Sequence, residues 1–240
     1  MDLLDIIIIL IVGLLGYSFA GVAGFGGGIV LMPTLTILIG PHAALPIICF
    51  GSIFATAARA WMNRTHIDWK VNFFFLIGAI PLIIVGTKIF VALDQATIEK
   101  ILGAFMLLLI CSKKLPFANN FKTPLWSFIP VGSVTAFIAG LVGVPGPFSA
   151  MFFLNYGLQK MAYIGTFAIA MAILRIPQLA VFAWDGFLNL QIIYLSIGLG
   201  IISVPAAYLG SRLLGKLPDK YFNIFINLIL VAFAVFFLVK

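Results

Sequence analysis

Two glycine-rich stretches inside apolar parts of the chain carry backbone groups that could bind a ligand. They read GVAGFGGG at residues 21–28 and GLVGVPGP at residues 140–147. Glycine costs about 1 kcal/mol and proline about 3 kcal/mol relative to alanine inside a helix, so each stretch must end one helix and start another. The first amides of the new helix carry the positive end of its dipole and attract anions. The resulting candidate substrate-binding residues are Gly24, Gly26, Gly27, Gly28, Gly143, Gly146 and Ser149.

Glycines in membrane helices also have a purely structural use, since they let neighbouring helices pack closely. A single glycine would favour that interpretation. Here Gly24 and Gly27 correspond to Gly143 and Gly146, and each stretch precedes a short apolar segment. Paired interruptions at matching positions of two repeats point to the binding site of a transporter.

Arg175 is the one cation of the sequence well inside an apolar segment, residues 161–184. A charge at the centre of a membrane helix costs at least about 2.5 kcal/mol, so this side chain should face the protein interior and have a partner. No carboxylate lies nearby in the sequence, and a guanidinium with its five donors suits a bound oxyanion. The alternatives are a guanidinium satisfied by backbone carbonyls and one that reaches outward to the interface. Arg59 lies near the end of its own segment, and we interpret it as a side chain that reaches outward to the interface.

Other polar side chains could line a path for a solute, although each is individually typical of a helix-packing hydrogen bond. They are Thr34, Thr36, Ser52, Thr56, Ser149, Asn155, Thr166 and Gln178. We group Gln178 with Arg175 and the glycines above as candidate substrate-binding residues.

Enzyme chemistry has no candidate residues in this sequence. No Asp or Glu lies at the middle of an apolar segment, and there is no Walker motif, HExxH or Gly-x-Ser-x-Gly. Cys49 and Cys111 lie in separate apolar segments without metal-ligand spacing, so we interpret both as small buried hydrophobic residues. We therefore expect no catalytic residue, no metal and no cofactor, and we disfavour a membrane enzyme.

The elements that position these residues must be membrane helices. Of the 240 residues, 63% are hydrophobic and 9% charged, and the mean hydropathy is +1.23. A soluble globular domain carries about 25% charged residues, so this composition excludes one. The net charge of +7 comes from single or paired basic residues at the ends of apolar segments, which is typical of topology signals. We expect a lipid bilayer and a small anionic substrate as partners, and no nucleic acid.

Charges, prolines and glycines divide the chain into helical segments. In the first half these are residues 4–23, 29–39, 43–62, 71–91 and 98–112, and in the second half residues 125–142, 148–156, 161–184, 190–214 and 221–239. Each half has a long segment, a glycine-rich break, a short segment and three longer ones. The sequence thus predicts an all-α integral membrane protein with a first repeat at residues 1–112, a linker at 113–124 and a second repeat at 125–240.

Loop charges predict the orientation of these repeats. Basic residues gather in the linker and in the loops at residues 63–70, 157–160 and 215–220, which the positive-inside rule places in the cytoplasm. With an odd number of crossings in each half, the repeats are inverted and both termini lie outside. Each short segment then forms the returning arm of a broken or re-entrant hairpin. We expect this protein in the plasma membrane, the inner membrane of a prokaryote.

Several stretches resemble a known family. GVAGFGGGIVLMPTL, and a following helix that ends in a basic cluster before the Asp-Trp pair at residues 68–69, resemble the first repeat of the sulfite exporter TauE/SafE family. AGLVGVPGPFSAMFF resembles its second repeat, but Pro145 and Pro147 interrupt the glycine run and Phe152 stands at the position of Pro33. The resemblance implies transport of a sulfur-containing anion such as sulfite, thiosulfate or an organosulfonate, in a family that includes exporters and importers.

The sequence therefore predicts a permease that moves a small anion by alternating access at the interface of two glycine hairpins. The alternatives are a permease for a different small solute and a structural membrane subunit without transport activity. Arg175, together with the absence of carboxylates from the middle of the segments, argues against a cation as the solute.

Overall fold

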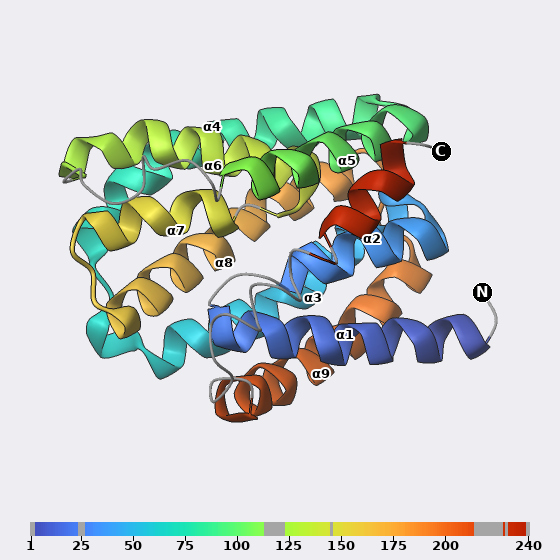
Figure 1. Cartoon of the computed structure of the whole chain (residues 1–240), viewed down its shortest axis with the longest axis horizontal. Coiled ribbons are helices and arrows are strands. Elements are labelled where there is room, and N and C mark those ends of the chain that lie inside the picture. Colours follow the sequence, from blue (N-terminus) through green and yellow to red (C-terminus); the bar gives the residue numbers. More distant parts are fainter. Residues whose placement is uncertain are drawn as a thin grey trace.

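The structure, a computed structural model, describes residues 3–23, 27–112, 123–144, 146–213, 228 and 230–238, and these are almost entirely helical. The first half contains α1 (Leu3–Ala23), α2 (Gly27–Ile39), α3 (Pro41–Met62), α4 (Trp69–Ala92) and α5 (Gln95–Ser112). The second half contains α6 (Phe128–Val142), α7 (Gly146–Asn155), α8 (Lys160–Trp184) and α9 (Leu190–Leu213), and residues 230–238 are also helical. Figure 1 shows these helices as one bundle. The predicted all-helical class is confirmed for the described part of the chain.

The predicted helices are found within a few residues of their expected bounds. α4 begins at Trp69, two residues before the predicted start, because Asp68 caps it and accepts bonds from the amides of Lys70 and Val71 at 3.0 and 3.1 Å. A short 3-10 turn, Leu125–Ser127, precedes α6 where one continuous helix was predicted. Most of the predicted linker and much of the predicted last helix, residues 221–239, lie outside the described residues.

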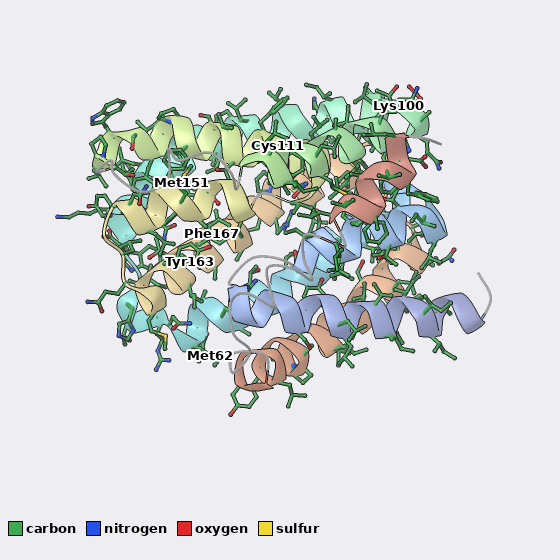
Figure 2. All side chains as sticks on the ribbon, viewed as in Figure 1. Met62, Lys100, Cys111, Met151, Tyr163 and Phe167 are labelled. Carbon is green, nitrogen blue, oxygen red and sulfur yellow. The ribbon has the colours of Figure 1, made fainter. Side chains whose placement is uncertain are left out.

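The bundle has the surface of a membrane protein. Four stretches of the described chain are long and apolar enough to cross a bilayer, namely Pro41–Met62, Trp69–Ala92, Leu125–Val142 and Met161–Trp184. Large apolar side chains such as Phe73, Ile176 and Ile201 point outward and are exposed, and Figure 2 shows the side chains that project from the outside of the bundle. All four tryptophans are exposed at helix ends, where interfacial aromatic residues are expected. The protein is therefore an integral membrane protein.

Helices from the two halves pack against each other. α4 lies along α6 and α1 along α9, while α3 and α8 pack against each other between these pairs (Figure 1). α3 also contacts α9, and α8 contacts α4. The short helices α2 and α7 contact the helices on either side of them in sequence, α1 and α3 for α2 and α6 and α8 for α7.

Glycines set the close approach of α4 to α6. A Cβ on Gly86 would lie 2.6 Å from the carbonyl oxygen of Phe137, and one on Gly140 would lie 2.7 Å from the amide nitrogen of Thr87. Gly78 and Gly132 similarly face backbone atoms of the opposite helix. Gly140, the first residue of the second glycine stretch, is therefore a packing residue, as small residues often are between membrane helices.

Candidate anion-binding site

The two glycine stretches break the helices where the sequence predicts it, and the breaks meet. α1 ends at Ala23 and α2 begins at Gly27, while α6 ends at Val142 and α7 begins at Gly146. The carbonyl oxygen of Gly143 lies 3.2 Å from the position that a Cβ on Gly28 would occupy. The start of α2 and the second turn are thus in direct contact. Gly24 and Gly26 lie outside the described residues.

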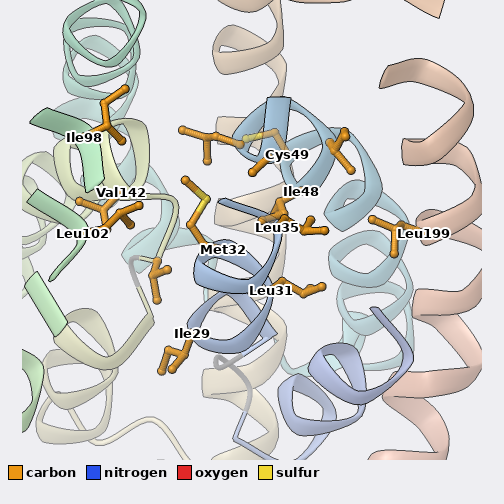
Figure 3. Packing of buried hydrophobic residues seen from close by; sticks show 14 of the residues in the cluster. Ile29, Leu31, Met32, Leu35, Ile48, Cys49, Ile98, Leu102, Val142 and Leu199 are labelled. Atoms are coloured by element: carbon orange, nitrogen blue, oxygen red, sulfur yellow. The ribbon is translucent and has the colours of Figure 1, made fainter. Parts of the chain in front are cut away.

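Gly143 ends α6 in a conformation that favours glycine. Its φ is 79°, in the left-handed region, and its amide donates to the carbonyl of Ala139 at 3.1 Å. A Cβ there would lie 2.6 Å from Cδ1 of Leu45. Met32 on α2 also lies beside the turn, with its sulfur 3.6 Å from the same Cβ position, and Figure 3 shows Met32 facing Val142 at the end of α6. The turn is therefore enclosed by side chains of the first half.

Arg175 is buried in α8, with 6% of its surface exposed. Its Nη1 donates to Oε1 of Gln178 at 2.6 Å and lies 3.3 Å from Sγ of Cys49 on α3. Within the described part of the chain, Arg175 forms no ion pair with a carboxylate. The sequence prediction that this guanidinium faces the protein interior is confirmed.

Gln178 connects Arg175 to the second glycine turn. The amide of Gln178 is fully buried, and its Nε2 donates to the carbonyl of Ala139 at 3.3 Å. The same carbonyl accepts the amide of Gly143. Because one carbonyl oxygen serves both groups, the position of Gln178, and through it Arg175, depends on the turn at Gly143.

Two buried donors at this site have no hydrogen-bond partner in the described structure, Nε of Arg175 itself and the hydroxyl of Tyr17. The hydroxyl of Thr36 on α2 is also buried without a partner among the described residues. Tyr17 on α1 lies within electrostatic range of both Arg175 and Cys49. A buried polar group left unpaired costs about 1 to 3 kcal/mol. A ligand that accepts hydrogen bonds would remove this cost.

Most of the other predicted path residues make hydrogen bonds within or between helices. The hydroxyls of Thr34, Ser52 and Thr56 donate to carbonyls of their own helices, at 2.7, 3.0 and 2.7 Å, which is the helix-packing role. Thr166 accepts the amide of Asp68 at 2.9 Å and so ties α8 to the start of α4. Ser149 is fully buried in the first turn of α7.

Sequence reasoning missed two residues beside Arg175. Cys49 is buried as predicted, but its thiol also contacts the Arg175 guanidinium. Cys111 is exposed, so the prediction that it is buried was wrong. Tyr17 gave a weak signal, as the only phenol in the first apolar segment. Arg175 Nε and the Tyr17 hydroxyl are donors without a partner among the described residues, and such groups can bind an anion.

Comparisons with known proteins point to a family of membrane transporters. The family model of the sulfite exporter TauE/SafE matches residues 9–237. A protein of Methanocaldococcus jannaschii described as a probable membrane transporter is 26% identical over 267 residues, which cover 97% of this chain and 94% of that protein. No solved structure matches the chain. With a family match over nearly its whole length, this chain belongs to the sulfite exporter TauE/SafE family of membrane transporters.

Proposed function

We propose that this transporter moves a small, sulfur-containing anion, such as sulfite, thiosulfate or an organosulfonate, and that Arg175 binds it. The observation that carries the proposal is a buried guanidinium whose described partners are the Gln178 amide and the Cys49 thiol. A buried cation without a counter-charge is costly. An oxyanion supplies both the missing charge and the hydrogen-bond acceptors.

The unpaired donors support an oxyanion in particular. Nε of Arg175 and the hydroxyl of Tyr17 both need acceptors, and a sulfite or sulfonate group presents three oxygens on one centre. The choice of sulfur as the central atom rests on the family description. We include the glycine turns in the site, at Gly27, Gly28, Gly143 and Gly146, with Ser149 and Gln178 beside them. Gly28 and Gly143 contact each other, and Gln178 joins Arg175 to the second turn.

We further propose that the anion crosses by alternating access between two inverted repeats. If α1 to α4 are exchanged for α6 to α9, the contact of α1 with α9 becomes that of α6 with α4, and α3 with α9 becomes α8 with α4. The hairpin contacts of α2 likewise become those of α7. A pattern that maps onto itself supports two equivalent repeats on either side of the contact between α3 and α8. Loop charges support opposite orientations, a cytoplasmic linker and termini outside the plasma membrane.

Binding measurements on purified protein test the proposed substrate. We expect sulfite, thiosulfate or a sulfonate to raise the thermal unfolding temperature, and carboxylates and amino acids to do so less. Arg175→Ala should weaken binding of the effective anion about a hundredfold, since it removes a charge-assisted contact worth a few kcal/mol. Arg175→Lys should retain part of the affinity because it keeps the charge.

Arg64→Gln is the matched control for loss of a cation. Arg64 is exposed and its guanidinium lies 4.8 Å from the centre of the Trp61 ring. Its removal should leave anion binding unchanged. A well-folded Arg175→Ala protein that binds and transports the anion as wild type does would show that Arg175 has a structural role.

A further inference from the structure

A second cation that is partly buried lies on α3, the helix whose Cys49 contacts Arg175. Arg59 follows Cys49 by ten residues on α3, which places it about 15 Å further along the helix axis. Its side chain turns back along the helix, because Nε donates to the carbonyl of Ala55 at 3.2 Å. The interpretation of Arg59 as a side chain that reaches outward was therefore wrong.

Tyr17 on α1 is an electrostatic neighbour of both cations. Its ring is on α1, and its hydroxyl lies 3.3 Å from the position that a Cβ on Gly51 would occupy, two residues beyond Cys49 on α3. Tyr17 is within electrostatic range of both Arg175 and Arg59. It is 3% exposed, and its hydroxyl has no hydrogen-bond partner among the described residues.

Tyr163 on α8 carries a second buried hydroxyl without a partner among the described residues. Its ring is fixed by aromatic packing, with centroids 5.9 Å from those of both Phe153 and Phe167. Tyr163 is 5% exposed, its hydroxyl has no partner in the described structure, and Arg59 is its electrostatic neighbour. Figure 2 places Tyr163 and Phe167 along α8, with Met62 marking the end of α3 nearby.

These groups lie on the way from Arg175 to one end of the bundle. α3 and α8 run in opposite directions, because Arg175 contacts Cys49 whereas Gly165, near the start of α8, faces Asn63 just after α3. Arg59 is half-buried and lies on the Asn63 side. Arg59, which is partly exposed, is thus followed by the tyrosine hydroxyls and then by the buried Arg175. An anion could bind to these groups one after the other.

We propose that Arg59, with the hydroxyls of Tyr163 and Tyr17, forms a second anion-binding station between Arg175 and the end of the bundle where α3 ends. The inference rests on the proposed passage of an anion through the Arg175 site. The station receives the anion from Arg175, or delivers it there, and Tyr17 serves both positions. It lowers the cost of moving a charge through an apolar interior.

The test separates binding at Arg175 from passage through the station. Full-length protein in liposomes is assayed for uptake of radiolabelled sulfite, and the same protein in detergent for thermal stabilisation by sulfite. Arg59→Gln should keep half-maximal stabilisation within about threefold of wild type, because Arg175 remains, yet slow uptake at least about tenfold by raising the barrier to crossing. Arg59→Lys should recover part of the rate.

Tyr163→Phe provides a variant that should fold normally. It removes a hydroxyl without a partner, so stability should be unchanged or higher, while uptake should fall about threefold for loss of one hydrogen bond to the passing anion. Arg64→Gln, which removes an exposed cation at the same end of α3, should change neither measurement.

The possible outcomes separate this station from the proposed function. Wild-type rates in both Arg59→Gln and Tyr163→Phe would overturn the second station and leave the Arg175 site intact. If Arg59→Gln abolishes sulfite binding as fully as Arg175→Ala, the two residues form one site and a separate station is excluded. If Arg59→Gln does not fold, a wild-type rate in Tyr163→Phe alone overturns the proposal. Wild-type protein that neither binds nor transports sulfite contradicts sulfite transport itself, and the station with it.

Discussion

Arg175 donates a hydrogen bond of 2.6 Å from Nη1 to Oε1 of Gln178, three residues later on the same helix. Gln178 is in turn held by the carbonyl of Ala139 on α6. The amide thus fixes the direction of a buried guanidinium while leaving its charge uncompensated. A carboxylate in the same place would have cancelled that charge.

Gln178 should therefore be a residue that positions Arg175. Its replacements can show separately how the orientation and the charge of the Arg175 guanidinium affect anion binding. Gln178→Leu removes the acceptor for Nη1 and should weaken anion binding about tenfold, the effect of one hydrogen bond to a charged group. Gln178→Glu should abolish binding, because the new carboxylate pairs with Arg175 and repels the anion, while stability without anion is kept or raised. Thermal unfolding with and without sulfite measures both effects. Strong stabilisation of Gln178→Glu by sulfite would show that the anion does not bind at Arg175.

The glycine turns should tolerate side chains less well than other glycines. Gly143→Ala forces a left-handed φ on alanine and meets Leu45, so we expect a loss of about 1 to 3 kcal/mol in stability. Gly198→Ala is the control, because its Cβ would meet only Cδ2 of Leu10, at 3.6 Å. Unfolding in detergent compares the two variants, and equal stabilities would contradict the strain at Gly143.

A role of the turns in binding has its own test. Gly27→Val should lose anion-induced stabilisation, since a side chain at the start of α2 blocks approach to the amides. Gly146→Val should impair binding as well if both turns face one site. If Gly27→Val binds the anion as wild type does, the glycine turns serve helix packing and do not bind the anion.

Cys49 should report whether the site opens. In a Cys111→Ala background, a small water-soluble thiol reagent should modify Cys49 slowly, because the thiol is fully buried. Saturating anion should slow the reaction further by occupying the space beside Arg175. Mass spectrometry of intact protein measures the rate. If Cys49 is modified equally fast with and without anion, the anion does not bind beside Cys49.

The proposed topology places the linker inside and the N-terminus outside. In a background without Cys49 and Cys111, a membrane-impermeant maleimide added to intact cells should label Asp2→Cys and spare Asn119→Cys. Permeabilised cells should show both labelled, which controls for reactivity. Labelling of Asn119→Cys but not Asp2→Cys in intact cells would show that the protein has the opposite orientation.

The sequence predicts the helices well because their ends are marked locally. Pro41 and Gly40 mark the start of α3, and the left-handed Gly143 marks the end of α6. The capping effect of Asp68 on α4 is also local, and weighing it would have given the observed start. The inward direction of Arg175 follows from the cost of a buried charge alone.

Contacts between distant helices could not be predicted in this way. The approach of Cys49 to Arg175, 126 residues apart, depends on how α3 packs against α8. The contact between Gly28 and Gly143 depends on how two hairpins from different halves meet. Arg59 was misjudged because its position near a helix end does not show which way the side chain turns or that two buried tyrosines lie beside it.

Locating the bound anion tests the central claim most directly. The protein is crystallised with a selenium analogue of the anion that stabilises it most, and anomalous scattering gives the selenium position. We predict a peak beside the Arg175 guanidinium, within reach of the Tyr17 hydroxyl, that is absent in Arg175→Ala. Selenium bound only elsewhere, with nothing beside Arg175, would contradict the assignment of Arg175 as the anion-binding residue.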